Sequence, residues 1–155
     1  MEDVRDEQDS VEREIVVAAP VERVWELITK PEHVRVWYAF DGTSIDLRPG
    51  GTIEHIWREH GRFLGVVEDV VPPTLFTYWY SNVPDTEPAP GTRTHVSFRL
   101  EPTADGHGTV LRVRESGLGE LTLSQEERRA YLAATTQGWS GGLTNLREHA
   151  ERVAR

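Results

Sequence analysis

The chain has 155 residues, of which 37% are hydrophobic and 28% charged, and these proportions are typical of one globular domain. Its 26 acidic and 17 basic residues give a net charge of −9, which disfavours binding to nucleic acid and to anionic lipid surfaces. It contains no Cys, so disulfides and thiolate metal sites are excluded, and no apolar run approaches the length of a membrane span. The polar N-terminus lacks the apolar region of a signal peptide, so we expect a cytoplasmic protein.

The N-terminal part is expected to hold one strand and two short helices. Residues 1–10 are polar and acidic, which predicts a flexible tail in front of a single domain over 11–155. Pro20 and Pro31 stand where a helix is expected to begin, because proline is favoured just before or at the first helical position. The predicted elements are a strand over 13–20 and helices over 21–30 and 31–40.

From residue 43 onward the pattern changes to strands, which are rich in β-branched and aromatic residues. Short turns such as His60-Gly61 separate most of them, and one longer loop over 82–91 is rich in proline. Consecutive strands joined by short turns predict an antiparallel sheet. The predicted strands are 43–51, 51–59, 62–73, 74–81, 92–102 and 109–116.

The C-terminal segment is predicted to form one long helix. Ser124 and Glu127 have the spacing of a capping box, which predicts its first turn. Gly138, Gly141 and Gly142 interrupt it, and each costs about 1 kcal/mol relative to Ala. A helix that keeps them needs space or close approach there, which indicates a helix over a cavity. Apolar or small residues at alternating steps of four and three share its inward face; they are Leu132, Thr136, Trp139, Leu143, Leu146, Ala150 and Val153.

Four segments in order carry a resemblance to a known family. They are "VAAPVERVWELITKPEHVRVWY", "LRPGGTIEH", "GVVEDVVPPTLFTYWY" and "QGWSGGLTNLREH". The first resembles the strand, helix and tryptophan that open the START-like SRPBCC superfamily, and the second resembles its glycine-pair hairpin. The third and fourth resemble the Gly-Val-x-Glu-x-x-x-Pro-x-x-Leu segment and the Gly-Trp-x-x-x-Leu-x-x-Leu helix of the branch of activator of Hsp90 ATPase homologues. The resemblance extends over residues 12–153.

The resemblance implies an α+β helix-grip fold, in which a curled antiparallel sheet of about seven strands surrounds the long C-terminal helix and two short helices follow the first strand. It also implies a cavity between sheet and helix, since members bind lipids, sterols, polyketides or hormones, or act as cyclases. Some relatives stimulate a chaperone ATPase, but those activators carry a further N-terminal domain for which this chain has no room. We therefore expect a small hydrophobic ligand rather than a chaperone as the partner, and the sequence leaves a homodimer open.

The candidate ligand contacts are large side chains on elements that face the expected cavity. Trp139 lies in the middle of the apolar face of the helix, and its indole N–H needs an acceptor when buried. Along 92–102, Val96 and Phe98 alternate with His95 and Ser97, so the former are expected to face inward. The candidate wall residues are Trp37, Phe40, Trp57, Tyr78, Phe98, Trp139 and Leu143, with His55 and Glu115 as polar anchors.

His55 and Glu115 are also the candidate acid and base if the protein is an enzyme. Glu115 follows Leu111 and Val113 at a period of two, so it is expected to face inward, where a carboxylate needs a partner or a raised pKa. The pattern around His55 does not decide which face of its strand points inward, but an inward imidazole would have a pKa suited to proton transfer. We predict a ligand-binding protein without metal or cofactor, with a cyclase or hydratase-type enzyme and a protein-binding module as the alternatives.

Overall fold

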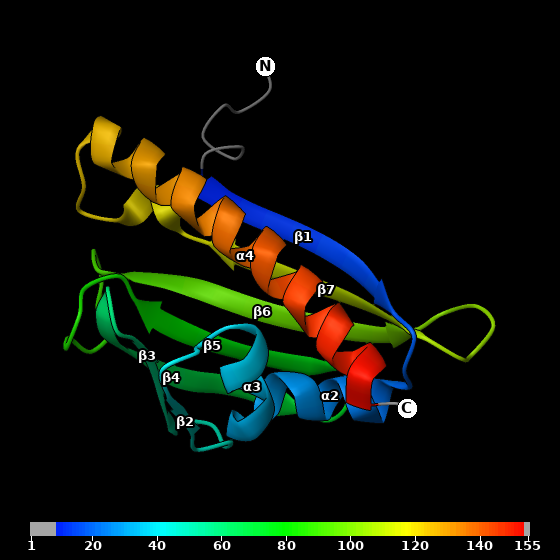
Figure 1. Ribbon diagram of the computed structural model, residues 1–155. Coiled ribbons are helices and arrows are strands. Elements are labelled where there is room, and N and C mark those ends of the chain that lie inside the picture. Colours follow the sequence, from blue (N-terminus) through cyan, green and yellow to red (C-terminus); the bar gives the residue numbers. More distant parts are fainter. Residues whose placement is uncertain (1–8, 154–155) are drawn as a thin grey trace.

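The computed structural model describes residues 9–153 as one curled antiparallel sheet with helices packed on one face (Figure 1). The strand order is β1-β7-β6-β5-β4-β3-β2, a meander closed by the return of the first strand to pair with the last. The predicted α+β helix-grip fold is confirmed, whereas residues 1–8 of the predicted tail lie outside the described residues. The strands are β1 Ser10–Val17, β2 Thr43–Ile45, β3 Thr52–Trp57, β4 Gly61–Val71, β5 Leu75–Ser81, β6 Arg93–Pro102 and β7 Thr109–Ser116.

Two short helices and one long helix cover the inner face of this sheet (Figure 1). α2 (Val21–Thr29) and α3 (Pro31–Trp37) connect β1 to β2. α4 (Gln125–Val153) follows β7 after the short 3-10 helix η1 (Leu118–Glu120). α4 runs across the sheet, and its C-terminal end lies against α2 and α3 (Figure 1).

The predicted capping box begins α4. The Glu127 N–H donates to Ser124 Oγ at 3.1 Å, and the Ser124 N–H donates to Glu127 Oε1 at 2.9 Å. Both donors would otherwise lack an intrahelical partner, so the reciprocal bonds fix the first turn of the helix.

The strand expected over 43–51 and the helix expected over 31–40 both end earlier than the sequence predicts. The strand expected over 43–51 ends at Ile45, because the chain then turns, with the Arg48 N–H donating to the Asp46 carbonyl and the Gly51 N–H donating to the Arg48 carbonyl. The helix expected over 31–40 ends at Trp37, after which Tyr38 leaves helical geometry at φ −139° and ψ −73°. Tyr38 and Phe40 therefore lie in a connecting segment rather than on a helix.

A bulge and a glycine in β4 help the sheet to bend around α4. The pairing of β4 with β5 shifts register after Val67, and the Asp69 N–H that the shift releases donates to Thr77 Oγ1 at 3.0 Å. A bulge of this kind bends its strand and increases the local twist. A Cβ at Gly65 would lie 2.8 Å from the Trp79 carbonyl oxygen, so the two strands approach too closely there for any side chain.

The inward faces of the strands form the core together with the helices. In β3, Ile53 and His55 are buried while Thr52 is exposed, which decides the face that the sequence left open. In β6, Val96 and Phe98 are buried on the side that their alternation predicts. The core therefore lies between the concave face of the sheet and the three helices.

α4 is buried along the part that begins at Trp139. From there it contributes Trp139, Gly142, Leu143, Leu146, His149 and Ala150 to the interior. Leu132 and Thr136, on the same face nearer its N-terminus, are partly exposed, and Val153 is exposed. The predicted apolar face of α4 is thus buried in the core from Trp139 to Ala150, and it is partly or fully exposed toward both ends of the helix.

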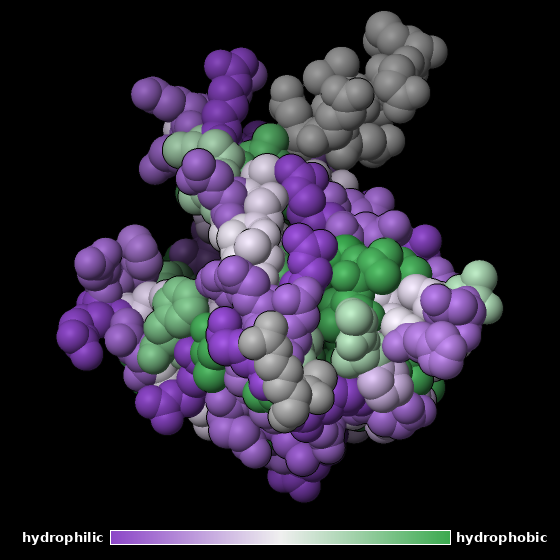
Figure 2. Space-filling view, turned by 45° about the vertical axis from the view of Figure 1, so that its right-hand side comes forward, coloured by the Kyte–Doolittle hydropathy of each residue, from purple (hydrophilic) through white to green (hydrophobic). Residues whose placement is uncertain are grey.

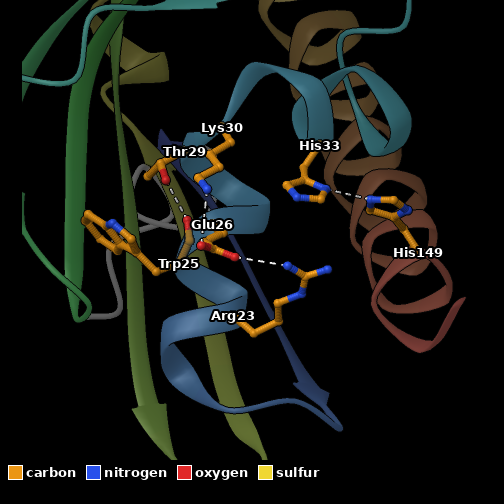
Figure 3. Close-up of polar contacts among 7 residues, drawn as sticks. All are labelled: Arg23, Trp25, Glu26, Thr29, Lys30, His33 and His149. Atoms are coloured by element: carbon orange, nitrogen blue, oxygen red, sulfur yellow. Dashed lines mark hydrogen bonds and ion pairs between the residues drawn. The ribbon is translucent and has the colours of Figure 1, made fainter. Parts of the chain in front are cut away.

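Polar contacts stabilise α2 locally and join α3 to α4 (Figure 3). Glu26 on α2 accepts hydrogen bonds from Arg23 at 3.0 Å and from Lys30 at 3.2 Å. Between α3 and α4, His33 Nδ1 and His149 Nε2 lie 2.9 Å apart. One ring must donate and the other accept, so at least one of these two imidazoles is neutral.

We expect acidification to destabilise the protein through His33 and His149. Burial lowers the pKa of both, helped by the charge of Arg23 beside His33 and by His33 beside His149. The unfolded chain therefore binds protons first, so this contribution is complete above about pH 6.5 and is lost as the pH falls toward the folded-state pKa values. From about pH 7 to about pH 5, the Tm of the wild type is expected to fall more than that of a His33→Gln/His149→Gln variant. Equal falls in Tm would contradict this assignment.

The outer surface is mainly hydrophilic on the face seen in Figure 2, where hydrophobic residues form separate patches. The large apolar side chains that are exposed include Val16, Phe40 and Val71, which lie on different elements. Within residues 9–153, no helix has the length and apolar character needed to cross a bilayer.

Candidate functional site

A cavity of about 550 Å³ lies between α4 and the sheet. α4 forms one side with Tyr131, Thr135, Gly138, Gly141, Gly142 and Asn145. The opposite side is largely aromatic and comes from α3, the segment after it, and strands β3 to β5; it is made by Trp37, Tyr38, Phe40, Trp57, Phe63 and Tyr80. Phe40 has 52% of its surface exposed, which places it at the rim.

Glu115 is the buried carboxylate of this cavity. Its side chain is 4% exposed and accepts three hydrogen bonds: from Thr94 at 2.6 Å, from Trp139 Nε1 at 2.9 Å and from the Tyr131 hydroxyl at 3.3 Å. Burial raises the pKa of this carboxyl group, while the hydrogen bonds from Thr94, Trp139 and Tyr131 act in the opposite direction. Within residues 9–153, no Lys or Arg forms an ion pair with it.

Strand register and helix phase bring these groups together. Thr94 on β6 lies opposite Tyr80 on β5, and both face inward. Glu115 on β7 lies opposite Val96, two residues beyond Thr94, so the Thr94 hydroxyl can reach Glu115 Oε2. α4 crosses above these strands and supplies Trp139 and Tyr131 from the other side. The carboxylate thus connects two strands with the helix.

Aromatic rings stack over the interior end of the cavity. Tyr38 lies parallel to Trp139, with ring centroids 4.8 Å apart and planes at 5°. The Trp57 ring meets Tyr38 edge to face at 5.1 Å, and the Trp57 Nε1–H donates to the Tyr38 carbonyl at 2.9 Å. These contacts fix the side chains that a ligand would touch, because each ring is held by a second one.

Two buried polar atoms at the cavity lack a protein partner among the described residues. They are the Tyr80 hydroxyl and Asn82 Oδ1, at the end of β5 and just after it. A buried polar group without a hydrogen bond costs about 1–3 kcal/mol, so a polar ligand group that reached either atom would remove that cost.

The three glycines of α4 have different surroundings. A Cβ at Gly142 would lie 3.4 Å from Tyr38 and 3.5 Å from Trp37, which are ordinary van der Waals distances. Cβ atoms at Gly138 and Gly141 would meet no atom within 4 Å, although both residues line the cavity. Close approach therefore does not require a glycine at Gly142, and the absence of side chains at Gly138 and Gly141 leaves open space.

The structure brings some of the sequence candidates together at the cavity and places the others in the core. Those that line it are Trp37, Phe40, Trp57, Glu115 and Trp139. Tyr78, Phe98 and Leu143 are buried but do not line it. The acceptor expected for the indole N–H of Trp139 is Glu115 itself, a pairing that the sequence did not suggest.

His55 lies apart from Glu115 and outside the cavity lining. Its side chain is 3% exposed and contacts the rings of Tyr38, Trp57 and Tyr80. Its Nδ1 lies 2.7 Å from Thr43 Oγ1. Burial lowers the pKa of His55 to about 4. The imidazole is therefore neutral and hydrogen-bonded near neutral pH, and the arrangement does not pair it with Glu115 for acid–base chemistry.

Sequence reasoning missed several residues of the site, above all Tyr131 and the polar atoms of Tyr80 and Asn82. The sequence does contain a signal for one set of cavity-lining residues of α4. Each member of this set comes one position before a residue of the predicted apolar face, so the set repeats with the same steps of four and three. They are Tyr131, Thr135, Gly138, Gly142 and Asn145, all of which line the cavity. For metals, residues 9–153 contain no group of three or more His, Asp or Glu side chains placed to hold an ion.

The comparison with protein families agrees with this architecture. A family model described as Activator of Hsp90 ATPase homolog 1-like protein matches residues 18–151. The comparison with curated proteins gave no match.

Solved structures share the fold at low sequence identity. Protein MLL2253 from Mesorhizobium loti is 24% identical, with a TM-score of 0.74, over 92% of this chain and 97% of that one. The Aha1 dimer from Colwellia psychrerythraea is 20% identical, with a TM-score of 0.73, over 92% of this chain and 96% of that one. DynU16, a protein in the dynemicin biosynthetic locus, is 25% identical, with a TM-score of 0.72. That match covers 92% of this chain and 47% of DynU16, so this chain spans about half of its length.

Replacing Trp139 by Phe is expected to destabilise the protein by about 1–3 kcal/mol through the lost hydrogen bond, because the carboxylate stays buried with one donor fewer. Urea unfolding of the Trp139→Phe variant measures the total cost, which also includes the space left by the smaller ring. The same substitution in a Glu115→Leu background isolates the hydrogen bond, since the packing cost is common to both. An equal cost in the two backgrounds would show that this bond contributes nothing.

Proposed function

We propose that this chain, which belongs to the family of Activator of Hsp90 ATPase homolog 1-like proteins, binds a small, largely apolar organic molecule in the cavity beside α4. The observation that carries the proposal is the combination of an aromatic wall with a few buried polar atoms that lack protein partners. Ligand sites typically have this composition, with apolar walls and a small number of polar groups that orient the ligand.

The size and contents of the cavity support this function. Its volume of about 550 Å³ lies within the range of about 300–1,000 Å³ that is usual for ligand pockets. Glu115, Tyr80 and Asn82 are the polar anchors we assign, and Trp37, Trp57 and Trp139 are the principal walls. A lipid-, sterol- or polyketide-like compound is the ligand class that the family resemblance of the sequence implies.

A polyketide cyclase or hydratase-type enzyme is the second candidate function. The observation that favours it is Glu115, a carboxyl group in the cavity whose pKa is raised by burial and which could therefore exchange a proton with a ligand. His55 would take no part, because it does not line the cavity. Cytoplasmic location stays a prediction of the sequence, and a protein-binding module and a homodimer stay the alternatives that the sequence left open.

Filling the open space at Gly138 and Gly141 is expected to stabilise the fold and weaken ligand binding. A Gly138→Ala/Gly141→Ala variant gains about 1 kcal/mol of helix stability per site, because neither methyl group meets another atom. Since both residues line the cavity, the added methyl groups are expected to reduce the room for a ligand. Thermal unfolding measures the first effect, and titration with phenylnaphthylamine, a neutral apolar fluorescent probe, measures the second.

Thr144→Ala is the matched control for this pair. Thr144 is exposed on α4 and does not line the cavity, so its replacement raises helix propensity without changing the space for the probe. We expect it to increase Tm and leave probe affinity unchanged. Absence of probe binding to the wild type, or equal affinity of the double alanine variant, would overturn the proposed function.

A further inference from the structure

We infer that the ligand of this cavity is an organic cation, an amine or ammonium compound with an apolar body, whose positive group pairs with Glu115. The inference rests on the proposed function, because it concerns the same cavity and names the class of molecule that the cavity selects. It depends on four observations: a buried carboxylate without a cation, unused acceptor positions, aromatic walls and the sign of the local charge.

The Glu115 carboxylate is desolvated without a compensating positive charge. Its side chain is 4% exposed, and its partners Thr94, Tyr131 and Trp139 are all neutral donors. No Lys or Arg lies among the cavity-lining residues that the structure describes. A buried carboxylate is costly unless it is paired with a cation, so a cationic ligand would supply what the protein does not.

The cavity offers unused acceptors and no Lys or Arg donor, while the Tyr80 hydroxyl, which also lacks a partner among the described residues, can donate or accept. A carboxylate can accept about four hydrogen bonds, and Glu115 already accepts two at Oε2 and one at Oε1. The remaining position is on Oε1. Asn82 Oδ1 is a second acceptor that has no partner among the described residues. An ammonium group is complementary to acceptors of this kind, because it carries donors and no acceptor.

The aromatic walls favour positive charge for a separate reason. The same cavity as Glu115 is lined by six aromatic side chains: Trp37, Tyr38, Trp57, Tyr80, Tyr131 and Trp139. The face of an aromatic ring carries partial negative charge and attracts a cation within about 6 Å of its centre. The same walls accommodate the apolar body of the ligand, so one molecule can satisfy both features.

The charge of the whole chain acts in the same direction. With a net charge of −9, the protein attracts small cations and repels small anions before they reach the cavity. An anionic ligand would meet this field and then the Glu115 carboxylate, while a neutral alcohol would gain a hydrogen bond but leave the carboxylate unpaired.

Three probes that share one naphthalene ring distinguish these cases: naphthylmethylamine, naphthylmethanol and naphthoate, substituted at the same position. Isothermal titration of the wild-type protein near neutral pH is expected to give an affinity for the amine at least about tenfold above that for the alcohol, with no measurable binding of the carboxylate. The comparison uses the unmodified chain, so it does not depend on the folding of a variant.

Glu115→Gln then tests the assigned group, since glutamine keeps the shape and can still accept from Trp139. We expect the affinity for the amine to fall about tenfold and that for the alcohol to change by less than about twofold. Glu12→Gln is the matched control: it removes the same charge from an exposed position on β1, and both affinities are expected to stay at the wild-type values.

The possible results separate the two proposals. Tightest binding of the amine, lost selectively in Glu115→Gln, supports the inference. Equal or tighter binding of the alcohol or the carboxylate to the wild type overturns the inference and leaves the proposed function standing. Failure of all three probes, together with failure of the neutral phenylnaphthylamine, overturns the proposed function and the inference with it.

Discussion

The hydrogen bond between the Trp139 indole and the Glu115 carboxylate is the contact on which the cavity depends. It joins the middle of α4 to β7, at the place where Thr94 ties the same carboxylate to β6. A buried carboxylate is expensive to leave without donors, so the helix and the two strands are held at one separation. That separation is large enough to leave space beside the carboxylate and small enough to keep it away from bulk water. The polar contact thus defines a geometry that apolar packing alone, which has no direction, would not specify.

α4 performs two tasks with two neighbouring faces. Trp139, Leu143, Leu146 and Ala150 pack into the core, while Gly138, Gly142 and Asn145, which precede the first three by one residue, border the cavity. Gly138 and Gly141 leave open space there, since a Cβ at either position would meet no atom within 4 Å. The helix accepts a cost of about 1 kcal/mol per glycine to keep that space, and such local losses of stability are common where a protein binds a ligand. The α3–α4 contact through His33 and His149 holds the end of the helix that has no such interruption.

The sequence was sufficient for the fold because its signals were local and agreed with one another. Proline positions marked α2 and α3, alternation marked β6 and β7, and the capping box marked the start of α4. The site was harder to predict because it depends on register and helix phase. Inward placement of Glu115 followed from its period of two, and the need of Trp139 for an acceptor followed from burial. Their pairing required the distance between strand and helix, which no local pattern contains. His55 is a second case in which a local pattern does not locate a side chain at the site. Its side chain points inward from β3, but it lies in the core and does not line the cavity.

The two ends of the sheet have a consequence for how the protein avoids aggregation. An outer strand presents unpaired backbone groups onto which a strand of another molecule can add. Here one outer strand, β2, has three residues, which is too short to template much pairing. The other, β1, carries Glu12, Arg13 and Glu14 in succession, and Arg13 donates to Ser140 of α4 at 3.0 Å. Charges and an adjacent helix both disfavour strand addition. Growth of the sheet from molecule to molecule is therefore discouraged at both edges, and two copies that associate would have to do so through helices, loops or the faces of the sheet.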